Sequence, residues 1–251
     1  MADEKGLVVD LQGETALVTG GSRNIGLAIA ETLRAAGARV CLVGLSDQKT
    51  LDQAVERLDP DGREAMGMLV QVSDEGAVIE AFEHVESKLG HVSILVNGAA
   101  RRPHEPFTSI SKQAWSEVID VILTGAFLTS REMFRRLPKE RLGAIVNIGG
   151  LSAHRPAKDR PHVIAAKSGL EGLTRALAEE GLGRIRANCI VPGAVETTRA
   201  PGQVPPRFAS DQDRLRGTSE DIARAVLPFT DPRQTYLTGQ TVHVNGGRFM
   251  S

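Results

Sequence analysis

The sequence is poor in aromatic residues and cysteines, and it has no excess of charge of either sign. Of its 251 residues 4% are aromatic, with a single Tyr, and two are cysteines. Cys41 and Cys189 are too few for a disulfide scaffold, and both lie in apolar runs that are typical of core strands. With 30 Lys and Arg against 31 Asp and Glu, the formal net charge is -1. The basic excess of most nucleic-acid-binding proteins is therefore missing.

Long apolar runs are also missing. No run approaches the roughly 18 residues that would predict a membrane-spanning helix. The first ten residues contain Asp3, Glu4 and Lys5 and lack the apolar core of a secretory signal. These absences predict a cytoplasmic protein in a reducing compartment. The composition, 41% hydrophobic and 24% charged, is that of an ordinary globular protein. We expect a single domain over residues 1–251.

Short apolar runs alternate with helical patterns along the chain, as expected of an α/β protein. The runs predict buried strands at Thr15–Thr19, Arg39–Gly44, Met66–Val72, Ile94–Asn97, Ala144–Ile148, Ala187–Val191 and Thr241–Val244. Helices are predicted around residues 25–36, 74–89, 111–137, 163–180 and 220–227. We therefore expect a mostly parallel, doubly wound sheet of seven strands with helices on both faces. The irregular residues 198–217 are expected to form a substrate loop at the carboxyl edge of this sheet.

A glycine-rich turn joins the first predicted strand to the first helix. Its residues are Gly20-Gly21-Ser22-Arg23-Asn24-Ile25-Gly26. Gly20 permits a tight turn, and Gly26 lets the helix approach the strand. The N–H groups that begin the helix can then bind a pyrophosphate. This strand–turn–helix context favours a dinucleotide cofactor over a turn that is only structural.

The residues after the second strand indicate which dinucleotide is bound. A carboxylate at that position would bind the adenosine ribose 2′-hydroxyl of NAD(H). The chain has Gly44-Leu45-Ser46 there, and the first carboxylate is Asp47. Arg23 and Ser46 could both bind a 2′-phosphate. We therefore expect NADP(H), with NAD(H) disfavoured; the alternative is that Arg23 is only a solvated loop residue.

These and three further motifs resemble the short-chain dehydrogenase/reductase family. The further motifs are Leu95-Val96-Asn97-Gly98-Ala99-Ala100, Ile190-Val191-Pro192-Gly193 followed by Thr197, and Leu237-Thr238-Gly239-Gln240 with Val244-Asn245-Gly246-Gly247. The resemblance covers about residues 11–249, and it implies a Rossmann-type fold, a three-layer αβα sandwich whose seven strands have the order 3-2-1-4-5-6-7. It implies a cofactor site formed by Gly20, Ser22, Arg23, Asn24, Ile25, Gly26, Ser46, Val72, Asn97, Gly98, Ala99, Lys167, Pro192, Gly193, Val195 and Thr197.

The catalytic residues of that family are mostly replaced in this chain. The resemblance implies a Tyr-x-x-x-Lys motif, a serine 13 residues before the tyrosine and an asparagine in the preceding helix. Lys167 matches the lysine, but the other three positions hold Val163, Gly150 and Ile122. The single tyrosine, Tyr236, precedes the last strand and cannot substitute. The resemblance leaves Lys167 a role at the nicotinamide ribose, and it leaves the reaction without its usual proton donor.

Three residues near these positions are candidate replacements. His162 suits acid–base chemistry near neutral pH, although a helix turns about 100° between it and Val163. Ser152 lies two residues after the lost serine and could act as a hydroxyl donor. His154 lies in the same loop. For each of the three, the alternative is a structural role. A branch of the family that reduces carbon–carbon double bonds of acyl-CoA thioesters also lacks the tyrosine, and the chain resembles 3-oxoacyl reductases equally well.

Basic residues gather in three segments that follow strand ends. They are Arg101, Arg102, Arg155, Lys158, Arg160, Arg199 and Arg207. They could bind an anionic substrate such as an acyl thioester, or they could simply be solvated. The sequence thus predicts an oxidoreductase acting on a carbonyl or an activated alkene. The alternative is a cofactor-binding protein without redox turnover. In either case the resemblance implies a homodimer or homotetramer.

Overall fold

A computed structural model of the chain describes residues 8–198 and 215–250. Its strands are β1 (Thr15–Thr19), β2 (Arg39–Gly44), β3 (Ala65–Leu69), β4 (Ile94–Asn97), β5 (Gly143–Ile148), β6 (Ile185–Pro192) and β7 (Thr241–Val244). Its helices are α1 (Asn24–Ala35), α2 (Gln48–Leu58), α3 (Glu75–Leu89), α4 (Lys112–Ile119), α5 (Gly125–Arg136), α6 (Pro161–Glu180) and α7 (Ser219–Thr230). A π-helical segment, η3 (Asp120–Thr124), joins α4 to α5, and short 3₁₀ turns lie at η2 (Phe107–Ser109) and η4 (Leu151–Ala153).

The seven strands form one parallel sheet in the predicted order, β3-β2-β1-β4-β5-β6-β7. Strand β1 lies between β2 and β4, with Val18 beside Leu42 on one side and beside Val96 on the other. The chain reverses its direction of winding here, so the carboxyl ends of β1 and β4 border the crevice where such sheets bind ligands. The prediction of a Rossmann-type sheet is confirmed.

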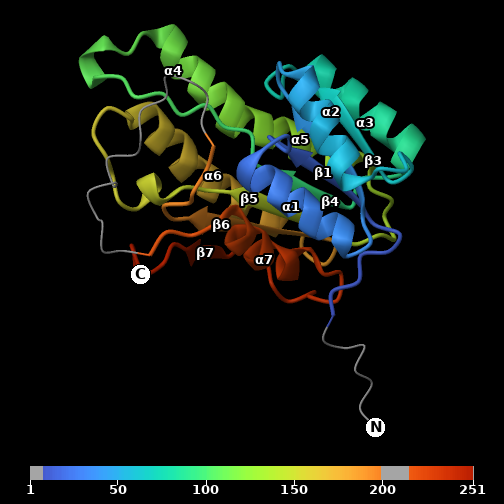
Figure 1. The fold of residues 1–251 in the computed structure, drawn as a ribbon. Helices are drawn as coiled ribbons and strands as arrows, with labels where there is room; N and C mark the ends of the chain where they lie inside the picture. The colour runs from blue at the N-terminus through green and yellow to red at the C-terminus, as the bar shows by residue number, and fades with distance from the viewer. Residues whose placement is uncertain (1–7, 199–214, 251) are drawn as a thin grey trace.

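Helices cover both faces of the sheet, and successive residues of each strand alternate between the two faces. Ala16 and Val18 of β1 pack in the core beneath α1, α2 and α7, whereas Leu17 packs in the core beneath α3, α5 and α6. Figure 1 shows α1 and α7 side by side on one face, in blue and red.

Several boundaries differ from the sequence-based predictions. Helix α2 was not predicted, because only three of its residues are buried, Leu51, Ala54 and Leu58. Strand β3 ends at Leu69, before the predicted Val72, and α7 continues through Pro228 to Thr230. The helix predicted over residues 111–137 begins as expected, with the Ser111 side chain accepting a hydrogen bond from Ala114, but the π-helical segment interrupts it. Most of the predicted substrate loop lies outside the described residues.

The two ends of that loop are described and lie together. Val195 and Gly217 form an isolated parallel bridge, with Glu196 N–H donating to the carbonyl of Gly217. Throughout the described ranges, no helix combines the length and apolarity that crossing a bilayer requires.

Candidate active site

The glycine-rich turn packs so closely that side chains would clash. Gly20 has φ +68°, and a Cβ there would lie 3.0 Å from the carbonyl carbon of Gly98 at the end of β4. A Cβ on Gly26 would lie 2.1 Å from the Gly20 carbonyl oxygen. The turn therefore requires glycine at both positions, as the sequence predicted from the packing of helix against strand.

The N-terminus of α1 differs from those of α2, α3, α4 and α7, which are capped by Asp47, Asp74, Ser111 and Thr218. Its N-cap residue is Arg23, and no side chain caps the helix. The first N–H groups of a helix have no partner within the helix, so an uncapped start of a twelve-residue helix can bind a phosphate group. The turn thus fits the pyrophosphate of a dinucleotide.

Asn24 adopts the left-handed conformation, with φ +51°. Asparagine tolerates this conformation better than most residues, which explains how it can stand where the resembling family has glycine. Its side chain also binds Thr198: Nδ2 donates to the Thr198 carbonyl at 3.0 Å, and Oδ1 accepts from the Thr198 N–H at 2.9 Å. Asn24 therefore connects the glycine-rich turn to the segment that follows β6, a contact that the sequence did not reveal.

Arg23 of the glycine-rich turn lies within range of the charge of Asp47, which follows Ser46 after the end of β2, and all three residues are exposed. The Asp47 carboxylate caps α2, accepting hydrogen bonds from Thr50 N–H at 3.0 Å and from Thr50 Oγ1 at 2.6 Å. These bonds lower the pKa of Asp47, and the positive charge of Arg23 lowers it further. The first carboxylate after β2 is therefore already engaged by its own helix.

Asn97 is buried in a polar network between the sheet and its helices. Its Oδ1 accepts from Thr129 Oγ1 at 2.7 Å, and its Nδ2 donates to Asn147 Oδ1 at 2.9 Å. Asn147 in turn donates to Thr174 Oγ1 at 2.8 Å. The network links α5, β4, β5 and α6, so the side chain of Asn97 stabilises the sheet edge beside the site.

The next two residues of the predicted cofactor site, Gly98 and Ala99, are held by β1. Both N–H groups donate to Thr19 Oγ1, at 3.0 and 3.2 Å. On the other side, β6 ends at Pro192, and a Cβ on Gly193 would lie 2.6 Å from Asn245 Cα. These contacts fix the carboxyl edge from β1 to β7.

Lys167 lies beneath the turn that follows β5. It is 4% exposed and donates a hydrogen bond to the carbonyl oxygen of Ile148, the last residue of β5. A Cβ on Gly150 would lie 3.5 Å from Lys167 Cγ and 3.8 Å from Ser152 Oγ. The structure therefore brings Lys167, Gly150 and Ser152 together. Burial, followed by the positive charge of Arg102, lowers the pKa of Lys167 to about 8.

Val163 and Ile122 belong to one apolar cluster between α4, η3 and α6. They are 1% and 2% exposed and pack with Val118, Ala126, Ala166 and Leu170. The resembling family has polar residues at these two positions, whereas here both residues are apolar and pack in the same cluster. The side chains of this cluster offer no proton to a substrate.

The two candidate histidines lie in different surroundings. His162 is 0% exposed, and neither ring nitrogen has a hydrogen-bond partner among the described residues. Burial lowers the pKa of His162, and the nearby backbone of Arg160 and then the charge of Glu105 act in the opposite direction. His154 Nε2 lies 2.8 Å from Glu171 Oε1, on the turn of α6 after Lys167, and its ring packs against those of His243 and Phe249. No sequence pattern predicts this cluster, because its members are far apart in the chain.

The basic residues of the edge are partly neutralised. Arg101 Nη1 lies 3.0 Å from Glu117 Oε2, and Arg102 is exposed. Arg199 and Arg207 fall outside the described residues.

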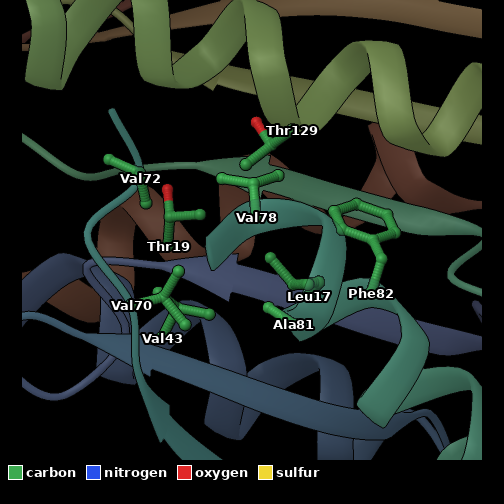
Figure 2. Close-up of a pocket in the computed structure, with 9 residues that line it drawn as sticks. All are labelled: Leu17, Thr19, Val43, Val70, Val72, Val78, Ala81, Phe82 and Thr129. Atoms are coloured by element: carbon green, nitrogen blue, oxygen red, sulfur yellow. The ribbon is translucent and has the colours of Figure 1, made fainter. Parts of the chain in front are cut away.

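A small cavity lies beneath this edge, between the sheet and α3. It has a volume of about 10 Å³, which is room for one water molecule at most. Apart from Thr19 and Thr129, its lining is apolar, and Val72 forms part of it (Figure 2). The cavity is a packing defect of the core and is too small for a cofactor or a substrate.

Comparison with known proteins agrees with this geometry. Residues 20–248 match the model of a family described as "Enoyl-(Acyl carrier protein) reductase". The chain is 33% identical to the 3-oxoacyl-(acyl-carrier-protein) reductases FabG of Aquifex aeolicus and Escherichia coli, with 96% of this chain and 99% and 100% of those proteins covered. It is also 35% identical to the FabG of Pseudomonas aeruginosa, covering 97% of this chain and all of that one.

Solved structures of related proteins have the same fold. A protein assigned as a gluconate dehydrogenase from Agrobacterium tumefaciens is 33% identical, with a TM-score of 0.88 over 96% of this chain and 98% of that one. A short-chain dehydrogenase/reductase from Brucella melitensis, described as a glucose/ribitol dehydrogenase, is 26% identical, with a TM-score of 0.88 over 98% and 100%. The fold and the relatives define an oxidoreductase of the class that uses nicotinamide dinucleotides. The chain belongs to the short-chain dehydrogenase/reductase family.

Proposed function

We propose that this protein is an NADP(H)-dependent oxidoreductase that acts on a carbonyl or an activated alkene, with an acyl thioester or another anionic molecule as substrate. The observation that carries the cofactor preference is the engagement of Asp47 by Thr50, which leaves Arg23 and Ser46 as the side chains near the end of β2 that suit a 2′-phosphate. Loss of a free carboxylate there removes the usual basis for preferring NAD(H).

The proposed cofactor contacts follow from positions along the edge. The uncapped start of α1, with Gly20, Ser22, Asn24 and Ile25, would bind the pyrophosphate. Lys167 and the residues Gly193–Thr197 would contact the nicotinamide half, and Asn97–Ala99 would border it. When bound, the cofactor supplies the hydride. The protein residues orient the substrate and exclude water.

The acyl-thioester proposal is supported by the relatives, which are named for reactions on acyl carrier protein substrates. The basic residues Arg102 and Lys158 follow β4 and β5, where an anionic substrate would enter. Ser152 supports the proposal from within the site, because its hydroxyl lies beside the space that the Gly150 side chain would otherwise fill. That hydroxyl could orient the oxygen of a carbonyl substrate.

The proposal is tested by NADPH oxidation, followed by absorbance, with a panel of 3-oxoacyl thioesters, enoyl thioesters, simple ketones and sugar ketones. We expect turnover with a thioester and with NADPH rather than NADH. Turnover with none of them, by a folded protein that binds NADPH, would contradict the redox proposal.

That result would favour the second candidate, a cofactor-binding protein without redox turnover. The observation in its favour is the apolar cluster at Val163 and Ile122. Its distinguishing result is tight NADPH binding without oxidation of the nucleotide by any substrate.

A further inference from the structure

We propose that Lys167 itself is the proton donor of the reaction, in addition to any contact with the cofactor. The inference rests on the proposed function and assigns the acid that the replaced residues no longer provide. It follows from the position of the ammonium group, from the number of its hydrogen bonds and from the surroundings of the other titratable groups at the same edge.

The ammonium group is at the right place. It donates to the carbonyl of Ile148, at the carboxyl end of β5, next to the crevice between β1 and β4. An ammonium has three N–H donors, and the structure assigns only this one acceptor to it within the described ranges. Gly150 has no side chain, so no side chain at this position covers the aliphatic part of Lys167. A Cβ added to Gly150 would lie 3.5 Å from Lys167 Cγ, which is an ordinary van der Waals contact. Two N–H groups can therefore point toward a molecule in the crevice.

The other titratable groups of this edge are less suitable. His162 lies in the first turn of α6, and no hydrogen bond among the described residues joins its ring to Ile148, Gly150 or Ser152, whereas the ring of His154 is held beside Glu171. Arginines do not release a proton at physiological pH. Asp47 lies at the far side of β1 and is ionised at neutral pH, because its hydrogen bonds lower its pKa. Among the described residues, His104, exposed on the segment after β4, is a competing acid that the experiment must exclude.

The groups that face Lys167 poise it for release of a proton near neutral pH. They are Arg102 from the segment after β4 and Cys189 from β6, with Glu171 on the next turn of α6. Burial and Arg102 lower the lysine pKa to about 8, and the effect of Cys189 in the opposite direction is smaller. General acids are most effective when their pKa lies close to the working pH.

The proposed step balances as follows for a carbonyl substrate. The bound cofactor would supply the hydride for the new C–H bond, with loss of its own C4–H bond, while the Lys167 ammonium gives its proton to the substrate oxygen. The C=O π bond, that C4–H bond and one N–H bond break, which leaves an alcohol, the oxidised cofactor and a neutral amine. The amine then takes a proton from water. In the reverse direction the neutral amine accepts the proton of the alcohol.

The test compares wild type with Lys167→Arg, which keeps the cation and N–H donors but cannot release a proton. The matched control is His104→Gln. In wild type, kcat for reduction should be constant at low pH and fall as the pH rises through about 8, because the protonated lysine is the active form. Lys167→Arg should bind NADPH within about threefold of wild type, lose at least ~100-fold in kcat and lack the fall near pH 8. His104→Gln should keep both kcat and the fall.

One further measurement keeps the inference testable if arginine does not fit the site. Without any substrate, the ¹³Cε resonance of one lysine should titrate near pH 8 in wild type and be missing from Lys167→Arg.

Retention of kcat and of its pH dependence by Lys167→Arg would overturn the inference while leaving the proposed function intact. If kcat of His104→Gln no longer fell as the pH rises through about 8, the acid would be His104, and the inference would likewise be overturned. A wild type without redox turnover would instead refute the proposed function on which the inference rests.

Discussion

Replacement of Arg23 by alanine should weaken NADPH binding while leaving NADH binding almost unchanged. Arg23 is exposed beside Ser46, and the nearest carboxylate, Asp47, is already hydrogen-bonded to Thr50. A hydrogen bond to a charged group contributes about 1.5–3 kcal/mol, and exposure to water reduces this. We therefore expect a loss of about 1–1.5 kcal/mol, which is a 5- to 12-fold rise in the Kd of NADPH.

Titration calorimetry with both nucleotides measures this directly. The matched control is Arg57→Ala, which removes the same charge from the last turn of α2, roughly 15 Å along the helix from its start. There Arg57 pairs with Glu31. Ser46→Asp should act in the same direction as Arg23→Ala, because its carboxylate would repel a 2′-phosphate. An unchanged ratio of NADPH to NADH affinity in Arg23→Ala, or an equal change in the control, would refute the assignment of the 2′-phosphate to this corner.

Three further predictions follow from the site and the helices. His162→Ala should lower the free energy of unfolding, measured in urea, by about 1–3 kcal/mol, because the ring is fully buried. Its kcat should stay within about threefold of wild type. A ~100-fold loss of kcat would instead identify His162 as the acid. The double variant Gly150→Ser, Val163→Tyr should restore ketone reduction, because the serine fits beside Lys167. It should also lower the free energy of unfolding by about 1–3 kcal/mol, because the tyrosine overpacks the apolar cluster. A double variant that folds and binds NADPH but does not reduce ketones would contradict the prediction. Light scattering at micromolar concentration should show a homodimer or homotetramer formed through the α4–α5 and α6 faces, where Phe127 is 44% exposed, and a monomer would be the contrary result.

Much of the fold could be predicted because its strands are nearly continuous apolar runs. β1, β2, β4 and β7 have the predicted boundaries. The βαβ alternation predicted a parallel sheet, and the resemblance to a known family implied the order of its strands. Helix α2 was missed because its buried face is narrow, and β3 was predicted too long because Val70 and Val72 are buried after the strand ends. Local patterns do not distinguish a buried strand residue from a buried loop residue.

The site could be predicted only in part. Gly20 and Gly26 could be assigned from the turn itself, because their conformation and packing are local. The proximity of Ser152 to Lys167, the bonds between Asn24 and Thr198 and the contact of His154 with Glu171 all depend on tertiary packing. A sequence pattern contains none of these distances. The hydrogen bonds that Asp47 accepts from Thr50 could not be predicted for a different reason, because they cap helix α2, which was itself not predicted.

Transfer of deuterium tests the central claim most directly, namely that the chain carries out redox chemistry with NADPH. NADPH labelled with deuterium at the nicotinamide C4, on either face in separate samples, is incubated with the enzyme and the thioester panel, and the products are examined by mass spectrometry. We predict one deuterium in the reduced product from one of the two labelled forms. NADPH that binds tightly but delivers no label to any substrate would contradict the account.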